Sequence, residues 1–163
     1  EEGEADDGRG ILSTHLFSDG RFIKDLWMEN PSSRKMPTFT LELFKAGDFF
    51  PKMDGKNVFR NASERMPEAV MIALQHNGLT IDDVDLLIPH QANLRINQFV
   101  ASGLGIPDEK VFNNIQRYGN TTAGSIPIAL DEAVEQGKIK EGSLVCLAAF
   151  GSGFTWASAL IRW

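Results

Sequence analysis

Short apolar runs alternate with segments of helical periodicity from residue 56 to the end of the chain. Between residues 56 and 77 an apolar residue recurs every three or four positions, which predicts an amphipathic helix. Pro67 is expected to kink this helix or to start a second one, and Gly78 is placed to end it. Further strands and helices are predicted over residues 84–88, 93–104, 110–113, 125–136, 144–150 and 154–161. This order predicts an α/β fold with buried strands.

The first fifty residues have a weaker pattern. Residues 1–9 are charged and contain glycine, so they are expected to form an exposed loop before a short strand over residues 10–16. Residues 17–50 are irregular and carry several turn signals. An irregular segment of this length in a compact domain is usually functional or an insertion, and the pattern alone assigns it no role.

The composition argues against several classes of protein. A hydrophobic content of 42% in 163 residues suits one globular domain. No apolar run approaches the roughly 20 residues that span a bilayer, and the acidic residues 1–7 do not resemble a signal peptide. The net charge of -6 disfavours nucleic acid as a partner. A single cysteine fits a reducing compartment, and the histidines lack metal-ligand spacing. We therefore expect a cytoplasmic protein with no metal and no membrane partner.

Two polar residues follow apolar or turn segments in positions suited to catalysis. His90 follows Pro89, which ends the strand predicted over residues 84–88, and Asn120 lies in a turn that leads into the helix predicted over residues 125–136. Ligands of open α/β sheets bind at the carboxyl ends of strands. A histidine and an asparagine there are suited to donate hydrogen bonds to one substrate oxygen. Alternatively, His90 only caps the next helix, and Asn120 is an ordinary turn residue beside a helix cap.

Ser152 and Cys146 also admit two interpretations each. Ser152 lies between two glycines that join the last two predicted strands. These three residues form either a simple hairpin turn or a backbone that presents an N–H group to an oxyanion. Cys146 alternates with apolar residues on a predicted strand and has no base beside it in sequence. We expect this cysteine to be part of the core and not a nucleophile.

Three motifs together carry a resemblance to a known family. They are Pro89-His90-Gln91-Ala92-Asn93, Gly119-Asn120-Thr121 and Gly151-Ser152-Gly153-Phe154-Thr155-Trp156. Further similarity extends over residues 11–16 and 53–60. In this order and spacing, they resemble the C-terminal half of a ketoacyl synthase III, a family with the layered α-β-α-β-α thiolase fold. The resemblance implies that residues 1–50 are the end of an N-terminal half and a connecting segment, and that residues 51–163 form the C-terminal domain.

The resemblance also implies the roles of individual residues. His90 and Asn120 would belong to a Cys-His-Asn triad, and the backbone N–H of Ser152 would bind an oxyanion. The channel for pantetheine, the thiol-bearing arm of coenzyme A and of acyl carrier protein, would be lined by Phe59, Ala92 and Asn93. The docking surface for acyl carrier protein would include Gln91, Arg95, Arg60 and Lys56.

The family's activity is a decarboxylative condensation of acyl-CoA with malonyl-acyl carrier protein. It needs no permanently bound cofactor, because coenzyme A and phosphopantetheine thioesters are its substrates. The nucleophilic cysteine belongs to the N-terminal half, so we expect this chain to be an inactive fragment of a longer, homodimeric enzyme. Two alternatives stay open: a related acyltransferase of secondary metabolism, and a non-catalytic domain that binds acyl groups or coenzyme A.

Overall fold

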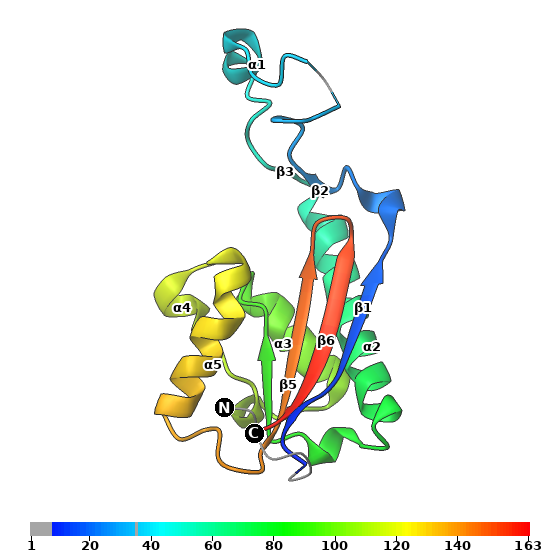
Figure 1. The fold of residues 1–163 in the computed structure, drawn as a ribbon, viewed down its shortest axis with the longest axis vertical. Helices are drawn as coiled ribbons and strands as arrows, with labels where there is room; N and C mark the ends of the chain where they lie inside the picture. Colours follow the sequence, from blue (N-terminus) through cyan, green and yellow to red (C-terminus); the bar gives the residue numbers. More distant parts are fainter. Residues whose placement is uncertain (1–7, 35) are drawn as a thin grey trace.

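A four-stranded sheet organises the structure, a computed structural model that describes residues 8–34 and 36–163 (Figure 1). The strand order is β1 (Gly10–Ser18), β6 (Thr155–Arg162), β5 (Leu144–Gly151) and β4 (Leu86–Pro89). Strands β5 and β4 are parallel, whereas β6 is antiparallel to both of its neighbours. The carboxyl ends of β4 and β5 therefore lie at the same edge of the sheet.

Helices cover both faces of the sheet. Helices α2 (Gly55–His76) and α3 (Leu94–Leu104) pack on the face that includes Leu87, and α5 (Ser125–Glu135) packs on the face that includes Leu86 and Ile88. Successive side chains of a strand point to opposite faces, which is why the uninterrupted apolar run of β4 is buried on both sides. The predicted α/β fold with buried strands is confirmed.

Local signals in the sequence set the ends of the helices. The Asp54 side chain accepts a hydrogen bond from the Asn57 backbone at 3.0 Å and caps α2, and Asn93 caps α3 in the same way. Gly105 ends α3 in the left-handed conformation with φ of 70°. The alternative that Pro67 starts a second helix is wrong, because α2 continues through Pro67. Buried side chains on both sides of the proline hold the helix against the sheet.

The strand predicted over residues 110–113 is also wrong. Val111 forms only an isolated bridge with Leu87, after a 3-10 turn over Asp108–Lys110. From Asn113 onward the chain turns away from β4, because its polar groups bond elsewhere: Asn113 pairs with the side chain of Asn97 at 2.7 Å. Short helical segments complete this part of the chain, namely Ile81–Asp83, α4 (Ile115–Tyr118) and Thr122–Gly124.

Residues 23–53, here called the arm, extend beyond the edge of the sheet where the β5–β6 hairpin turns (Figure 1). The arm is irregular, as predicted, and its described residues form only β2 (Leu26–Trp27), α1 (Leu41–Lys45) and β3 (Lys52–Met53). Three of its phenylalanine rings, those of Phe39, Phe44 and Phe49, cluster with centroids 5.0–6.5 Å apart. Several of its large apolar side chains are exposed, with Met36 at 85% and Phe39 at 62%. An exposed apolar group of this kind indicates an interaction surface.

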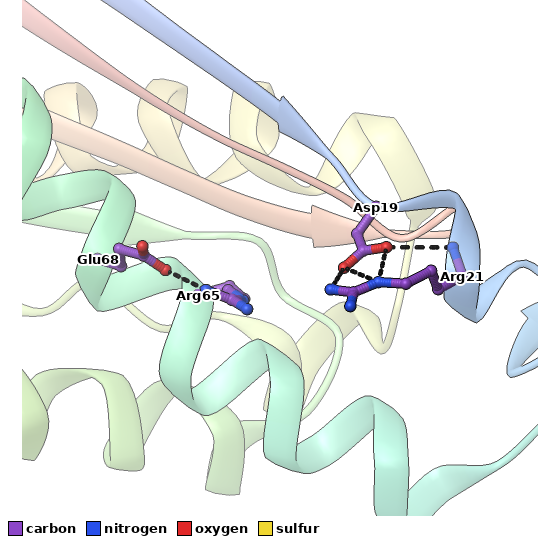
Figure 2. Close-up of polar contacts among 4 residues, drawn as sticks. All are labelled: Asp19, Arg21, Arg65 and Glu68. Atoms are coloured by element: carbon purple, nitrogen blue, oxygen red, sulfur yellow. Dashed lines mark hydrogen bonds and ion pairs between the residues drawn. The ribbon is translucent and has the colours of Figure 1, made fainter.

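The chain passes from β1 into the arm through a fixed turn. Asp19 exchanges two backbone hydrogen bonds with Phe154, both of 2.8 Å. Figure 2 shows that the guanidinium of Arg21 grips the Asp19 carboxylate, with Nε and Nη2 donating at 2.9 and 2.5 Å. These hydrogen bonds lower the pKa of Asp19 to about 2. Figure 2 also shows Arg65 of α2 paired with Glu68, and the Arg65 guanidinium lies 5.3 Å from the ring centre of Trp156 on β6.

Strand β1 is part of the same sheet as the last three strands, pairing with β6 along its length. The sheet therefore contains strands from both sides of the predicted division at residue 50. Residues 1–7 of the predicted N-terminal loop lie outside the described residues. Within the described part of the chain, none of the helices combines the length and the apolar character needed to cross a bilayer.

Candidate active site

His90 lies where the sequence predicted it, immediately after the carboxyl end of β4. Its backbone N–H donates to the carbonyl of Ala148 on the parallel strand β5, at 2.8 Å. This bond continues the ladder between the two strands by one residue. The position of His90 is therefore set by the sheet and not by a flexible loop.

The imidazole of His90 is held by Ser125, the first residue of α5. Nδ1 of His90 lies 2.6 Å from Oγ of Ser125, and the same Oγ accepts a bond from the Gln91 backbone N–H at 3.1 Å. Since Oγ already accepts one bond, its own hydrogen is available to donate to Nδ1. Burial lowers the pKa of His90 below the usual 6.5, which favours the neutral ring. A neutral ring that accepts at Nδ1 carries its proton on Nε2, and that atom is then a donor to a ligand.

This burial predicts a pH-dependent stability. The unfolded imidazole binds a proton at a higher pH than the folded one, so the free energy of unfolding should fall as the pH drops from about 6.5 through the lowered pKa of His90. The free energy of unfolding in urea is measured at pH 5 and pH 7.5 for the wild type and for His90→Gln. The change with pH that the wild type shows and the variant lacks is the contribution of His90. Equal pH dependence in the two proteins would contradict it.

Asn120 follows α4 in a turn whose geometry restricts the sequence. Gly119 has φ of 69° and ψ of -161°, a region that is open essentially only to glycine. Thr122 has φ of 53°, which is unusual for a β-branched residue. The Asn120 carboxamide oxygen accepts a hydrogen bond from the Thr122 backbone at 2.9 Å. This bond fixes the side chain and leaves its NH₂ group as a donor.

The alternative for Asn120 is borne out in one part only: the bond from the Thr122 backbone is that of an ordinary turn asparagine, but the helix cap expected beside it is absent. Helix α5 starts after Gly124, which offers no capping side chain. The Ser125 hydroxyl, an expected cap, instead bonds His90 and Gln91. Ser125 therefore holds His90, and the backbone of Thr122 holds Asn120.

His90 and Asn120 both line two adjacent cavities. The narrow cavity, of about 330 Å³, runs between them and the start of α2, and its lining includes Phe59, Ala92 and Asn93. The structure thus brings together all three residues predicted for the pantetheine channel. The wide cavity, of about 900 Å³, opens over the ends of β1, β5 and β6 and is also lined by Ser152. The two donors therefore face a narrow channel on one side and an open apolar surface on the other.

Gln91 does not lie on a surface, contrary to the prediction that it helps to dock a carrier protein. Only 1% of the residue is exposed. Its Nε2 donates to the carbonyls of Pro89 and Phe112 at 2.7 and 3.2 Å, and its Oε1 accepts from the backbone N–H groups of Asn114 and Ile115 at 3.1 and 3.2 Å. Gln91 thus joins the loop that carries His90 to the start of α4, which leads to Asn120.

Glu132 is a second buried polar residue that supports the segment leading to Asn120. This role was not predicted from the sequence. Glu132 lies on α5 beside the buried Ala133 and is itself only 9% exposed. Its carboxylate accepts hydrogen bonds from Tyr118 and Arg117, and from Asn114 at 3.0 Å. These bonds, that from Tyr118 above all, lower the pKa of Glu132. A helix of four residues such as α4 is not stable alone, so Glu132 holds it in place.

Ser152 occupies the turn between β5 and β6. Its hydroxyl donates to the carbonyl of Leu26 in the arm at 2.5 Å. Gly153 has φ of 136°, and a Cβ atom there would come within 2.9 Å of the Thr155 side chain. A residue with a side chain does not fit at this position without a shift, so Gly153 fixes the path of the hairpin.

Cys146 is part of the core, as predicted, with 0% of the residue exposed. Burial raises the pKa of its thiol to about 12, so the reactive thiolate is scarcely populated at neutral pH. We expect Cys146 in the folded protein to resist iodoacetamide at pH 8 and to react only after unfolding in urea. Mass spectrometry of the alkylated protein measures this, and rapid labelling of the folded chain would contradict it.

The three basic residues predicted for the docking surface differ from Lys52 in their ion pairing. Lys56, Arg60 and Arg95 are exposed, and among the described residues no carboxylate lies within ion-pair distance of them. Lys52 instead pairs with Glu29 at 2.9 Å and with Asp48 at 3.2 Å. Its charge is compensated within the arm. Over the described ranges, there is no group of three or more side chains suited to hold a metal ion.

Known proteins share this architecture. The described fold superimposes on the crystal structure of the 3-oxoacyl-[acyl-carrier-protein] synthase III of Thermus thermophilus with a TM-score of 0.86 and 40% identity, covering 99% of this chain and 48% of that one. That of Aquifex aeolicus VF5 gives 0.85 and 38%, covering 98% and 46%. The chain therefore has the α/β fold of the thiolase-like class.

Sequence comparison assigns the chain to a family within this class. A family model described as "3-Oxoacyl-[acyl-carrier-protein (ACP)] synthase III C terminal" matches residues 74–163, more than half of the chain. The beta-ketoacyl-[acyl-carrier-protein] synthase III of Roseiflexus castenholzii is 46% identical over 159 residues, which are 98% of this chain and 48% of the relative. The chain belongs to the 3-oxoacyl-[acyl-carrier-protein] synthase III family and corresponds to its C-terminal part. It spans about half the length of the curated relatives that it matches.

Proposed function

We propose that the enzyme containing this chain condenses an acyl-CoA starter with malonyl-acyl carrier protein to give 3-oxoacyl-acyl carrier protein, the first condensation of fatty acid synthesis. The observation that carries the proposal is the pair of donors, His90 and Asn120, in the lining of one narrow cavity. The names of the relatives, which are synthases acting with acyl carrier protein, support this choice of substrate.

The proposed reaction begins with an acyl group held as a thioester on a cysteine outside this chain, whose own Cys146 is buried. Malonyl thioester enters along the narrow cavity, the bond to its terminal carboxylate breaks, and carbon dioxide leaves. The electron pair of that bond forms an enolate, whose oxygen accepts hydrogen bonds from Nε2 of His90 and Nδ2 of Asn120. Donors fixed before the reaction lower the barrier because they need no reorganisation.

The enolate carbon then attacks the acyl thioester. A carbon–carbon bond forms, a second oxyanion develops on the acyl carbonyl, and the cysteine thiolate leaves when that carbonyl is restored. For this second oxyanion we propose the backbone N–H of Ser152 as a donor. Its place in the lining of the wide cavity, which also contains His90 and Asn120, supports this role.

The proposed partners follow from the open surfaces. We propose that an N-terminal half of the longer enzyme covers the wide cavity and supplies the cysteine. The exposed apolar side chains of β1 and the arm, among them Leu16 at 77%, support such a cover. We assign residues 1–50, which include β1, to the end of the N-terminal half and the connecting segment. Residues 51–163 then form the C-terminal domain. We further propose that the whole enzyme is a homodimer without a permanently bound cofactor.

One assay tests the proposed function. The complete enzyme is mixed with an acyl-CoA and with malonyl-acyl carrier protein that carries ¹⁴C in its free carboxylate. We expect release of ¹⁴CO₂ together with a 3-oxoacyl product on the carrier protein, identified by mass spectrometry. Acylation of the enzyme without any 3-oxoacyl product, for every acyl chain length supplied, would disprove the condensation.

A further inference from the structure

The narrow and the wide cavity meet beside the candidate donors. The residues that line both cavities are Leu26, His90, Asn120, Phe150 and Gly151. His90 and Asn120 are the donors, and Gly151 has no side chain. Phe150 is only 8% exposed and packs against Phe154 with ring centroids 4.8 Å apart. Leu26 is therefore the apolar residue at this junction that does not belong to the four-stranded sheet or to its core.

Leu26 lies at the base of the arm and is held there by several contacts. It pairs with Met53 in the antiparallel ribbon of β2 and β3, and Met53 also lines the narrow cavity. Its side chain is half-buried against the hydrophobic core that includes Met66. Its carbonyl accepts the hydrogen bond from the Ser152 hydroxyl at 2.5 Å. A ribbon with two residues in each strand is marginal by itself, so the bond from Ser152 helps to hold Leu26 in place.

The proposed reaction brings one particular substrate atom to this junction. The pantetheine arm lies in the narrow cavity, and the thioester oxygen accepts hydrogen bonds from His90 and Asn120. The acyl thioester under attack lies in the wide cavity, so the attacking α-carbon must lie where the two cavities meet. In a malonyl thioester this carbon bears only hydrogen besides the carboxylate. A methyl group on the α-carbon needs additional space at the junction that Leu26 borders.

We propose that Leu26 excludes malonyl thioesters with a substituent on the α-carbon, such as methylmalonyl, and that the Ser152 hydroxyl positions Leu26 for this task. The inference rests on the proposed function, because the junction receives an α-carbon only if a malonyl thioester is the substrate. A methyl group that meets a fixed apolar wall must displace the wall or move the thioester oxygen away from its donors. An apolar site distinguishes substrates that differ by one carbon by about 10- to 200-fold.

Competition between two substrates tests the proposal. The complete enzyme receives an acyl-CoA and an equimolar mixture of malonyl- and methylmalonyl-acyl carrier protein, and mass spectrometry gives the ratio of unbranched to α-methyl 3-oxoacyl product. This ratio does not depend on the fraction of enzyme that is folded. For Leu26→Ala we expect the ratio to fall by about 10- to 200-fold. Leu26→Val should lower it by a smaller factor, and this variant serves as the test if the larger truncation does not fold.

Leu41→Ala is the matched control for Leu26→Ala. Leu41 lies in the same arm, is 57% exposed and lines neither cavity. The same truncation at this position should therefore leave the product ratio at the wild-type value. An equal fall in the two variants would assign the effect to the arm as a whole and would overturn the role of Leu26.

Variants of Ser152 separate its hydroxyl from its backbone. Ser152→Ala keeps the backbone N–H but removes the bond to Leu26, so the product ratio should fall, though by less than in Leu26→Ala. Ser152→Thr keeps a hydroxyl group and should retain the wild-type ratio. An equal loss of selectivity in both variants would show that the hydroxyl does not position Leu26.

The outcomes separate this inference from the proposed function. An unchanged ratio in Leu26→Ala would overturn the inference, and so would a wild type that uses both substrates equally well. In both cases the wild type still forms a 3-oxoacyl product from malonyl-acyl carrier protein, so the proposed function stands. If the wild type forms no such product, the proposed function fails, and the inference fails with it.

Discussion

Asn120→Ala and His90→Ala are each expected to lower condensation by the complete enzyme by about 10²- to 10³-fold, the usual cost of losing one preorganised donor. Transfer of the acyl group from coenzyme A to the enzyme should continue. In that step the oxyanion forms on the acyl carbonyl, for which we propose the backbone N–H of Ser152 and neither His90 nor Asn120. The rate of ¹⁴CO₂ release from labelled malonyl thioester measures the first step, and mass spectrometry of the acylated enzyme measures the second.

Thr121→Ala is the matched control for this pair. Thr121 lies in the same turn, and its hydroxyl makes no hydrogen bond to the described residues. Its loss should therefore leave both steps near the wild-type rate. If His90→Ala and Asn120→Ala release carbon dioxide as fast as Thr121→Ala does, then the assigned roles are wrong.

Gln91→Leu is expected to have the largest effect on stability. The substitution keeps a buried side chain of similar length but removes the partners of two carbonyls and of two backbone N–H groups. Each buried polar group left without a partner costs about 1–3 kcal/mol, so a loss of about 3 kcal/mol or more in the free energy of unfolding is expected. Urea unfolding of the complete enzyme measures this loss.

Gln98→Leu provides the comparison for Gln91. Gln98 is an exposed glutamine on α3, and its substitution changes the chemistry of the residue without burying a polar group. Surface substitutions of this kind usually change stability by less than about 0.5 kcal/mol. Equal destabilisation by the two substitutions would show that Gln91 does not hold the loop of His90 to α4.

The sequence predicted those features that depend on neighbours in the chain. The apolar run that ends at Pro89 placed His90 at the carboxyl end of a strand, and the motif around Gly119 placed Asn120 in a turn. Glycines marked the helix ends because their effect is local. The buried strands could be anticipated for the same reason, whereas the lining of the narrow cavity was implied by the resemblance to the family.

Buried polar residues with distant partners were not predictable in this way. Gln91 lies in the short connection between β4 and α3. Its position in the sequence is therefore that of an ordinary exposed loop residue. Its burial depends on partners 21 to 24 positions further along the chain. Glu132 looks like a solvated charge of an amphipathic helix, and only the packing of α4 against α5 explains its position. Periodicity contains no information about such contacts.

The hydrogen bond between Ser152 and Leu26 couples the arm to the hairpin that lines the wide cavity. Two segments that share a bond do not move independently, so any partner that shifts the arm changes the free energy of the hairpin. Thermodynamic linkage makes this coupling reciprocal for binding: a ligand that orders the hairpin must tighten the grip of the arm on its partner by the same factor. We therefore expect a partner of the arm and a ligand of the wide cavity to affect the binding of one another.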